Sequence, residues 1–196
     1  MPTPDHGHLE YSLQWLPSVL RKAGLKVVEQ PQWQTRGHGE IGPIKMIVCH
    51  HTADNARSNA PSLGEVTNGR SDLAGPLAQL VLGRDGTFFV ICAGKAWHAG
   101  SGSWKGITAG NECAIGIEAE NSGYTKGPNA EAWSEVQLTA YAKGCAALAD
   151  YAKIKTNMVI GHKEWAPKRK VDPTFDMNAF RTRVDTFRKP AAVAST

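Results

Sequence analysis

KMIVCHHTA, residues 45–53, is a short run of mostly apolar residues that reaches two adjacent histidines. An apolar run without polar alternation predicts a strand inside a sheet that is covered on both faces. Such strands are typical of α/β proteins, in which helices pack on the sheet. His50 and His51 would stand at the carboxyl end of this strand, with side chains pointing to opposite faces.

Further strands are predicted on the C-terminal side of this run. Residues 77–82 and 87–92 are apolar runs separated by GRDG. This spacing predicts a hairpin, because Asp-Gly tolerates the positive φ angles of a tight turn. Residues 158–161 form another short apolar run, which we interpret as a strand.

The stretch AIGIEAEN, residues 114–121, alternates in the way that a half-covered strand does. One face carries Ile115 and Ile117, and the other carries Gly116, Glu118 and Glu120. The second face is therefore either solvated or functional.

Residues 132–152 predict the longest helix, with Ser134 or Asn129 as the N-cap. Its larger side chains recur at roughly helical spacing, at Val136, Leu138, Tyr141, Cys145, Leu148 and Tyr151. Residues 9–24 predict a first helix that is kinked or restarted at Pro17.

Residues 26–42 lack a clear period and are expected to form an extended crossing segment. Residues 176–188 predict a final amphipathic helix. Its inward residues would be Phe180, Val184 and Phe187.

Together these elements predict a single α/β domain with a mixed central β-sheet flanked by helices. We expect an N-terminal helix and extended segment over residues 1–44, the main domain over residues 45–188, and a flexible tail over residues 189–196. A length of 196 residues fits one domain with an appendage.

The composition narrows the class of protein. Hydrophobic residues make up 41% and charged residues 20%, which is near the average of globular proteins and argues against a disordered chain. The net charge of +4 identifies no particular polyanion, and we expect no nucleic-acid partner. No stretch approaches the ~18 apolar residues of a membrane span, and the N-terminus does not read as an export signal, so we expect no membrane insertion.

The four cysteines lack CxxC spacing and lie in apolar surroundings. We therefore expect buried free thiols rather than a disulfide framework at Cys49, Cys92, Cys113 and Cys145.

Ligand-type side chains concentrate at the end of residues 45–53 and in GHKEWAPKRKVDP, residues 161–173. Pro167 and Pro173 forbid a continuous helix there, so a loop must fold back to bring His162 and Asp172 together. Two imidazoles and one carboxylate with an open fourth position are what a catalytic zinc ion uses. Taken singly, however, a histidine at a strand end is an ordinary polar residue, and the basic residues 168–170 are a solvated run.

Four segments occur in an order and spacing that resemble a known family: KMIVCHHTA, GRDGTFFVICAGKAWHAG, AIGIEAEN and GHKEWAPKRKVDP. On these motifs the chain resembles the zinc-dependent N-acetylmuramoyl-L-alanine amidases of the type-2 amidase superfamily. That superfamily also contains peptidoglycan recognition proteins and phage lysins. The resemblance runs from about residue 45 to residue 188 and implies the type-2 amidase fold with one Zn²⁺ per chain.

The same resemblance implies a ligand set for zinc. His50, His162 and Asp172 match the ligand positions, and His51 is then a neighbour. Strand alternation agrees that only one residue of the histidine pair faces the metal.

The resemblance also implies the catalytic groups. Glu118 matches the acid–base carboxylate, and Lys170 matches the cation that stabilises the oxyanion. Some relatives carry a tyrosine before the RDG turn, but the equivalent stretch PLAQLVLGRDG has none, so Glu118 would carry its role. Glu120 is the competing candidate, because it shares the strand face of Glu118.

Substrate contacts are expected at Trp97 and His98 in AWHAG, and at Asn121. Trp97 could equally be a core aromatic residue. Asn55 and Trp104 are weaker candidates.

The resemblance implies a peptidoglycan hydrolase that cleaves the amide between the lactyl group of N-acetylmuramic acid and the L-alanine of the stem peptide. We expect a phage endolysin that is made in the host cytoplasm without a signal peptide, reaches the cell wall after the membrane is perforated, and is a monomer. A bacterial amidase that stays inside the cell or is exported unconventionally is the other setting. The alternative functions are a non-catalytic peptidoglycan-binding module and a zinc peptidase that cuts within the stem peptide.

Overall fold

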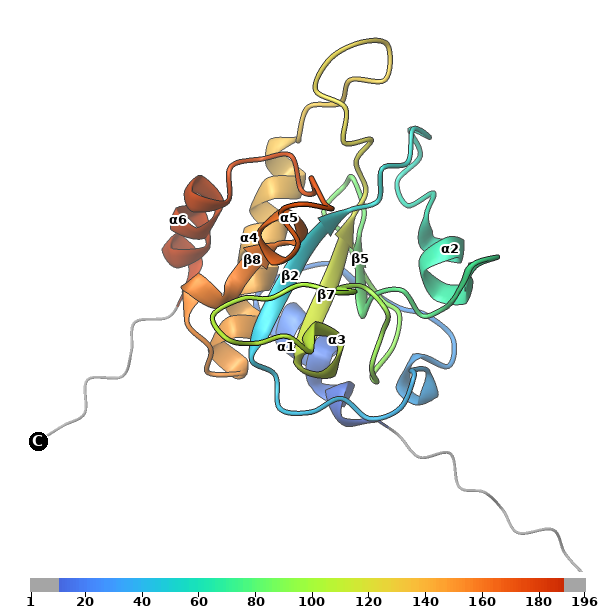
Figure 1. Cartoon of the computed structure of the whole chain (residues 1–196), viewed down its shortest axis with the longest axis vertical. Helices are drawn as coiled ribbons and strands as arrows, with labels where there is room; N and C mark the ends of the chain where they lie inside the picture. The colour runs from blue at the N-terminus through green and yellow to red at the C-terminus, as the bar shows by residue number, and fades with distance from the viewer. Residues whose placement is uncertain (1–10, 189–196) are drawn as a thin grey trace, which may run out of the picture.

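The structure is a computed structural model that describes residues 11–188. The first two residues of the predicted N-terminal helix and the expected tail, residues 189–196, lie outside this range. The centre of the molecule is a six-stranded sheet (Figure 1). Its order is β1 (Val27–Glu29), β6 (Phe88–Val90), β5 (Leu80–Leu82), β7 (Ala114–Ala119), β2 (Met46–His51) and β8 (Val159–Gly161).

The sheet is mixed, as predicted. Among the described strands of this sheet, only β5 and β6 pair in antiparallel fashion, and they are the two arms of the hairpin that GRDG closes. Strands β3 (Gly69–Arg70) and β4 (Leu73–Ala74) form a separate two-stranded antiparallel sheet. The other neighbouring pairs of the six-stranded sheet are parallel. Together with the helices that flank the sheet, this confirms a single α/β domain.

The register of β2 positions the site. All six residues of β2 are buried, in agreement with a central strand that is covered on both faces. His50 pairs with Glu118 on β7, and Cys49 pairs with Gly161, the last residue of β8. Because these three strands are parallel, their carboxyl ends meet at one edge of the sheet, where α5 (His162–Trp165) begins (Figure 1).

Helices α1 (Leu16–Lys22), α4 (Glu135–Tyr151) and α6 (Met177–Phe187) pack around the main hydrophobic core. Pro17 lies in the first turn of α1, after the 3₁₀ turn η1 (Ser12–Trp15), so the helix restarts there as predicted. Ser134 is the N-cap of α4, and its hydroxyl accepts a hydrogen bond from the Gln137 amide at 3.1 Å.

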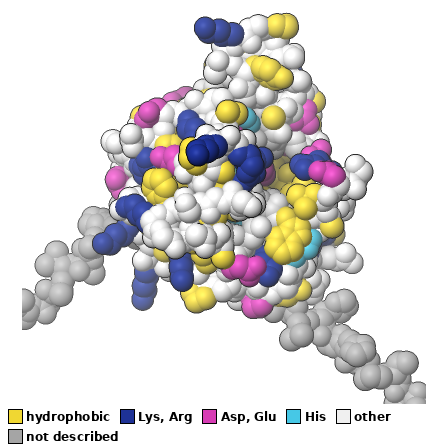
Figure 2. Space-filling model, viewed as in Figure 1, with side chains coloured by type: hydrophobic (Ala, Val, Ile, Leu, Met, Phe, Trp, Pro, Cys, Tyr) yellow, Lys and Arg dark blue, Asp and Glu magenta, His cyan; other side chains and the backbone are white. Residues whose placement is uncertain are grey.

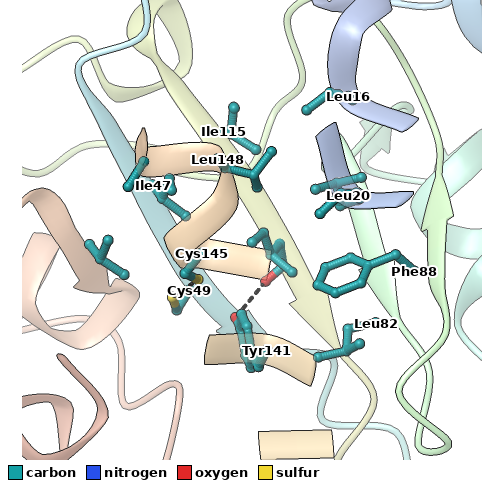
Figure 3. Packing of buried hydrophobic residues seen from close by; sticks show 14 of the residues in the cluster. Leu16, Leu20, Ile47, Cys49, Leu82, Phe88, Ile115, Tyr141, Cys145 and Leu148 are labelled. Atoms are coloured by element: carbon teal, nitrogen blue, oxygen red, sulfur yellow. Dashed lines mark hydrogen bonds between the residues drawn. The ribbon is translucent and has the colours of Figure 1, made fainter. Parts of the chain in front are cut away.

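The core lies between the sheet and these helices. Figure 3 shows α4 against the central strands, with Leu148 near Ile115 and Cys145 beside Cys49 (Figure 3). Leu16 and Leu20 of α1 and Phe88 of β6 lie on the other side of Leu148. The remaining short elements are η2 (Trp33–Thr35), α2 (Leu63–Asn68), β3 (Gly69–Arg70), β4 (Leu73–Ala74), α3 (Gly110–Cys113) and η3 (Thr156–Met158).

Some details differ from the sequence expectation. The extended segment of residues 26–42 contributes strand β1, which pairs with β6. Phe187 is exposed at the end of α6, whereas Phe180 and Val184 point inward as predicted. Val136 and Tyr151 of α4 are also exposed, and the Tyr151 ring stacks on Trp15 at a centroid distance of 4.2 Å.

All four cysteines are buried and free, as expected. The sulfur atoms of Cys49 and Cys145 lie 3.9 Å apart. Among the described residues, no helix is long and apolar enough to span a bilayer.

Candidate active site

Three side chains meet at the carboxyl edge of β2 and β8. The Nδ1 atoms of His50 and His162 are 2.9 Å apart, and each lies 3.2 Å from Oδ2 of Asp172. The chain folds back as the two prolines require: α5 ends at Trp165, and the Lys163 amide donates to the Asp172 carbonyl at 2.7 Å. These residues form the group in the described chain that could hold a metal ion.

Hydrogen bonds on the far side of each ring fix the nitrogen that faces the cluster. The Nε2 atom of His162 lies 3.0 Å from the Ala99 carbonyl, which can only accept, so Nε2 carries the proton. In the same way, Nε2 of His98 donates to the Ala114 carbonyl at 3.1 Å. Burial holds the pKa of His98 well below its ordinary value, so the ring is neutral and its Nδ1 atom is an acceptor.

That acceptor determines the tautomer of His50. Nε2 of His50 lies 3.2 Å from Nδ1 of His98 and must donate to it. Burial lowers the pKa of His50 to about 4, so its Nδ1 atom bears no proton. His50, His162 and Asp172, which we call the three-acceptor cluster, point two imidazole Nδ1 atoms and one carboxylate oxygen at one another. Such atoms repel unless a cation lies among them, so the donor set fits a metal ion of the kind that takes two imidazoles and a carboxylate.

Glu118 stands next to this cluster on β7. Its Oε1 atom lies 3.8 Å from Nδ1 of His50, and its Oε2 atom is buried without a hydrogen-bond partner. The side chain is only 18% exposed. Burial and the nearby Asp172 carboxylate raise the pKa of Glu118 to about 8, and Lys170 opposes this shift. A carboxyl group in these surroundings is suited to exchanging protons near neutral pH.

A cleft of about 700 Å³ opens above these groups. Its lining includes a group of polar and charged side chains, namely Glu118, His162, Asp172, Lys170 and Arg169. The lining also includes four apolar side chains that belong to one hydrophobic cluster, namely Val66, Leu73, Leu77 and Trp97. On the face shown in Figure 2, Lys and Arg side chains gather near the middle of the molecule (Figure 2).

The residues proposed as substrate contacts occupy different places. Trp97 is half-buried and lines the cleft. His98 also borders the cleft, but its ring nitrogens are engaged with His50 and Ala114. Asn121 is fully buried outside the cleft lining, and its side-chain oxygen accepts from the Gly123 amide at 2.9 Å.

The weaker candidates lie outside the lining as well. Asn55 is exposed on the segment that follows β2. Trp104 donates its indole N–H to the Asn157 carbonyl at 3.0 Å and packs on a separate hydrophobic cluster.

His51 is not one of the residues of the three-acceptor cluster, but it borders the cleft. Its Nδ1 atom is buried without a partner. Gly123 packs against its ring so closely that an added Cβ would lie 2.4 Å from Nε2 of His51, at a backbone φ of +73°. This position therefore requires glycine.

Glu120 is fully buried and does not line the cleft. Its carboxylate accepts hydrogen bonds from the Thr52 hydroxyl at 2.9 Å and from the amide and hydroxyl of Ser62 at 2.9 and 3.0 Å. It thereby anchors both ends of residues 52–62, which we call the rim segment. Thr52, Ala53 and Ser62 of this segment border the cleft.

A second carboxylate holds the middle of the rim segment. Glu131 receives two hydrogen bonds from Arg84 at 2.7 and 3.1 Å, and it forms an ion pair with Arg57 at 3.0 Å. Arg84 also donates to the carbonyls of Ser58 and Asp54 at 2.9 and 3.2 Å. The arginine of the RDG turn therefore supports the wall of the cleft.

Sequence reasoning did not identify Arg70 and Arg169, which line the cleft. Arg169 donates to the carbonyls of Ala99 and Ser101 at 3.2 and 2.6 Å. The only feature of the sequence that pointed to Arg169 as a cleft residue was its position next to Lys170. A run of basic residues on its own predicts a solvated surface. Arg70 lies in the two-residue strand β3, which has no periodicity to reveal it.

Comparisons with known proteins agree with this geometry. The N-acetylmuramoyl-L-alanine amidase AmiD of Escherichia coli (strain K12) is 30% identical over 164 residues, which cover 81% of this chain and 59% of that protein. The 1,6-anhydro-N-acetylmuramyl-L-alanine amidase AmpD of Haemophilus influenzae is 35% identical over 98 residues, or 49% of this chain and 50% of that protein. The chain thus spans between half and three fifths of these relatives.

A solved structure of E. coli AmiD in complex with the substrate anhydro-N-acetylmuramic acid-L-Ala-D-γ-Glu-L-Lys is similar in fold. It has a TM-score of 0.59 and 25% identity, and the match covers 76% of this chain and 60% of that chain. Residues 40–175 match the Amidase_2 family, described as N-acetylmuramoyl-L-alanine amidase. This matched range contains the three-acceptor cluster and Glu118, and the chain therefore belongs to the N-acetylmuramoyl-L-alanine amidase family.

Proposed function

We propose that the protein is a zinc-dependent peptidoglycan hydrolase. It would cleave the amide between the lactyl group of N-acetylmuramic acid and the L-alanine of the stem peptide. The observation that carries this proposal is the convergence of ligand atoms from His50, His162 and Asp172, beside the buried carboxyl group of Glu118. Family membership and the names of the relatives support the choice of substrate.

The side chains around the cluster divide the chemical work. Zinc, when bound, would supply the Lewis acidity that activates an unreactive amide. Glu118 takes a proton from the attacking water and returns it to the leaving nitrogen of L-alanine. Lys170 lines the cleft beside Asp172 and places a positive charge where negative charge develops on the amide oxygen.

Product analysis distinguishes this function from its alternatives. Purified peptidoglycan is digested with zinc-saturated protein, and the fragments are identified by mass spectrometry. We expect free lactyl carboxyl groups together with new amino groups on L-alanine. New amino groups elsewhere in the stem peptide would identify a peptidase, and wall binding without any product would identify a binding module.

We further propose that the protein acts as a monomer on the intact cell wall, after the membrane is perforated. The net charge of +4 supports association with an anionic wall. Turnover of insoluble sacculi is compared with turnover of a soluble 1,6-anhydro-muramyl peptide. We expect faster release of peptides from sacculi, and activity confined to the soluble anhydro-muramyl peptide would contradict wall lysis.

A further inference from the structure

Residues 33–39 run beside residues 91–95, the segment that leads into Trp97. Backbone hydrogen bonds join the two segments from the Ala93 amide to the Trp33 carbonyl at 2.9 Å and from the His38 amide to the Lys95 carbonyl at 2.8 Å. Gly37 allows the close contact, because a Cβ there would lie 2.7 Å from the Cα of Gly94. Residues 33–39 are therefore attached directly to the segment that leads into Trp97, a residue of the cleft lining.

The attachment ends in a ring stack. The imidazole of His38 lies on the indole of Trp97 with a centroid distance of 4.3 Å and an interplanar angle of 15°. The Trp97 amide donates to the Pro76 carbonyl at 3.1 Å, which fixes the backbone from the other direction. Nε2 of His38 is buried without a partner, so this nitrogen contributes no hydrogen bond to the contact.

Trp97 is also the largest member of the apolar side of the cleft, with Val66, Leu73 and Leu77. This apolar part of the lining can hold the methyl and CH surface of a muramyl peptide while the amide faces Glu118. The plane of the indole decides how well that surface fits. His38 precedes residues 40–175, the range that matches the family model.

We propose that His38 is a positioning residue, whose ring holds the Trp97 indole in the orientation that binds the apolar surface of the muramyl peptide. This inference rests on the proposed function, because it assumes that muramyl peptide is the ligand. It makes the N-terminal segment part of the substrate site, although that segment donates no group to the reaction.

The test measures KM and kcat of zinc-saturated protein on a soluble muramyl peptide, with thermal unfolding in parallel. In His38→Ala, loss of the stack should raise KM by about 3- to 10-fold, as expected for an aromatic pair. The value of kcat should stay within about 2-fold, because the contact is the same in the ground state and the transition state. His38→Phe keeps a planar ring but removes both ring nitrogens, including the hydrogen bonding of the imidazole with the backbone of Pro76 and Ala74. If the stack is what positions Trp97, its KM should stay near that of wild type.

Tyr151→Ala is the matched control, because it removes a ring stack of similar geometry on Trp15, distant from the cleft. This variant should lose stability without a change in KM. If His38→Ala does not fold, His38→Leu replaces it, since leucine fills the volume without a planar ring.

A KM within 2-fold of wild type in the ring-deleted variant, or a His38→Phe variant as impaired as His38→Ala, would overturn the inference. Wild-type protein that does not turn over the muramyl peptide would instead refute the proposed function, and the inference with it.

Discussion

Nε2 of His50 donates a hydrogen bond to Nδ1 of His98 across 3.2 Å, and His98 in turn donates to the Ala114 carbonyl. This relay fixes the tautomer of His50, so that its other nitrogen faces His162 and Asp172. His98 therefore acts on the metal site through His50, in addition to bordering the cleft.

Removal of His98 should weaken zinc binding. His98→Ala leaves the Nε2–H of His50 without its acceptor, and loss of such an outer hydrogen bond typically lowers metal affinity by about 10- to 100-fold. His98→Asn can restore an acceptor close to the position of Nδ1 and should recover part of the affinity. Titration against a competing chelator measures both variants, and an unchanged affinity in His98→Ala would refute the relay.

The ligand assignment predicts a contrast between the two adjacent histidines. His50→Ala, His162→Ala and Asp172→Ala should each lose zinc and activity together, because each removes one of three ligands. His51→Ala should retain zinc, since His51 lies outside the three-acceptor cluster. Elemental analysis decides the assignment, and full zinc occupancy in His50→Ala with loss in His51→Ala would reverse it.

Substitution of Glu118 and of Glu120 should affect activity and stability differently. Glu118→Gln keeps the shape but removes the proton acceptor, so turnover should fall by roughly 10² to 10⁴, while zinc content and thermal stability stay close to wild type. Glu120→Gln should lose much less activity but should be less stable, because its carboxylate accepts three hydrogen bonds from Thr52 and Ser62. The opposite pattern of activities would show that the base is misassigned.

The Arg84–Glu131 pair should make the stability of the protein depend on pH. Burial raises the pKa of Glu131, but hydrogen bonds from Arg84 and Ser122 outweigh burial and leave the pKa below its ordinary value. A carboxyl group with a lowered pKa stabilises the fold above the ordinary Glu pKa of about 4.3, and this contribution is lost as the pH falls further.

Glu131→Gln should therefore lower the free energy of unfolding by about 1–3 kcal/mol at pH 7, the usual value of a charged hydrogen-bonded group. Denaturant unfolding at pH 7 and pH 3 measures the difference between wild type and variant. This difference should shrink at pH 3, and a constant difference would show that the charge of Glu131 does not contribute.

The elements with strong local signals could be predicted from the sequence. The apolar run before His50, the GRDG hairpin and the Ser134-capped helix each carry their own pattern, and each is found in the structure. Strand β1 could not be predicted, because its three residues, of which Val28 is exposed, are too few for a period. It exists through parallel pairing with β6, which lies far along the chain.

The sequence was sufficient to predict which residues form the site, but not where all of the neighbouring side chains lie. Motif order indicated His50, His162, Asp172 and Glu118, which the structure brings together. Side-chain direction beyond the end of β7 was not predictable, because strand alternation stops at Ala119. Glu120 and Asn121 lie buried outside the cleft, where hydrogen bonds from Thr52, Ser62 and Gly123 hold their side chains.

The two carboxylates that hold the rim segment, buried Glu120 and partly buried Glu131, also affect the thermodynamics of binding. A loop that is mobile in the free protein loses conformational entropy when a ligand orders it, which weakens affinity. In this protein Glu120 and Glu131 already order the loop at folding. Binding of a muramyl peptide should then order little of the protein. The entropic cost of ordering the loop should therefore subtract little from the free energy gained by contacts in the cleft.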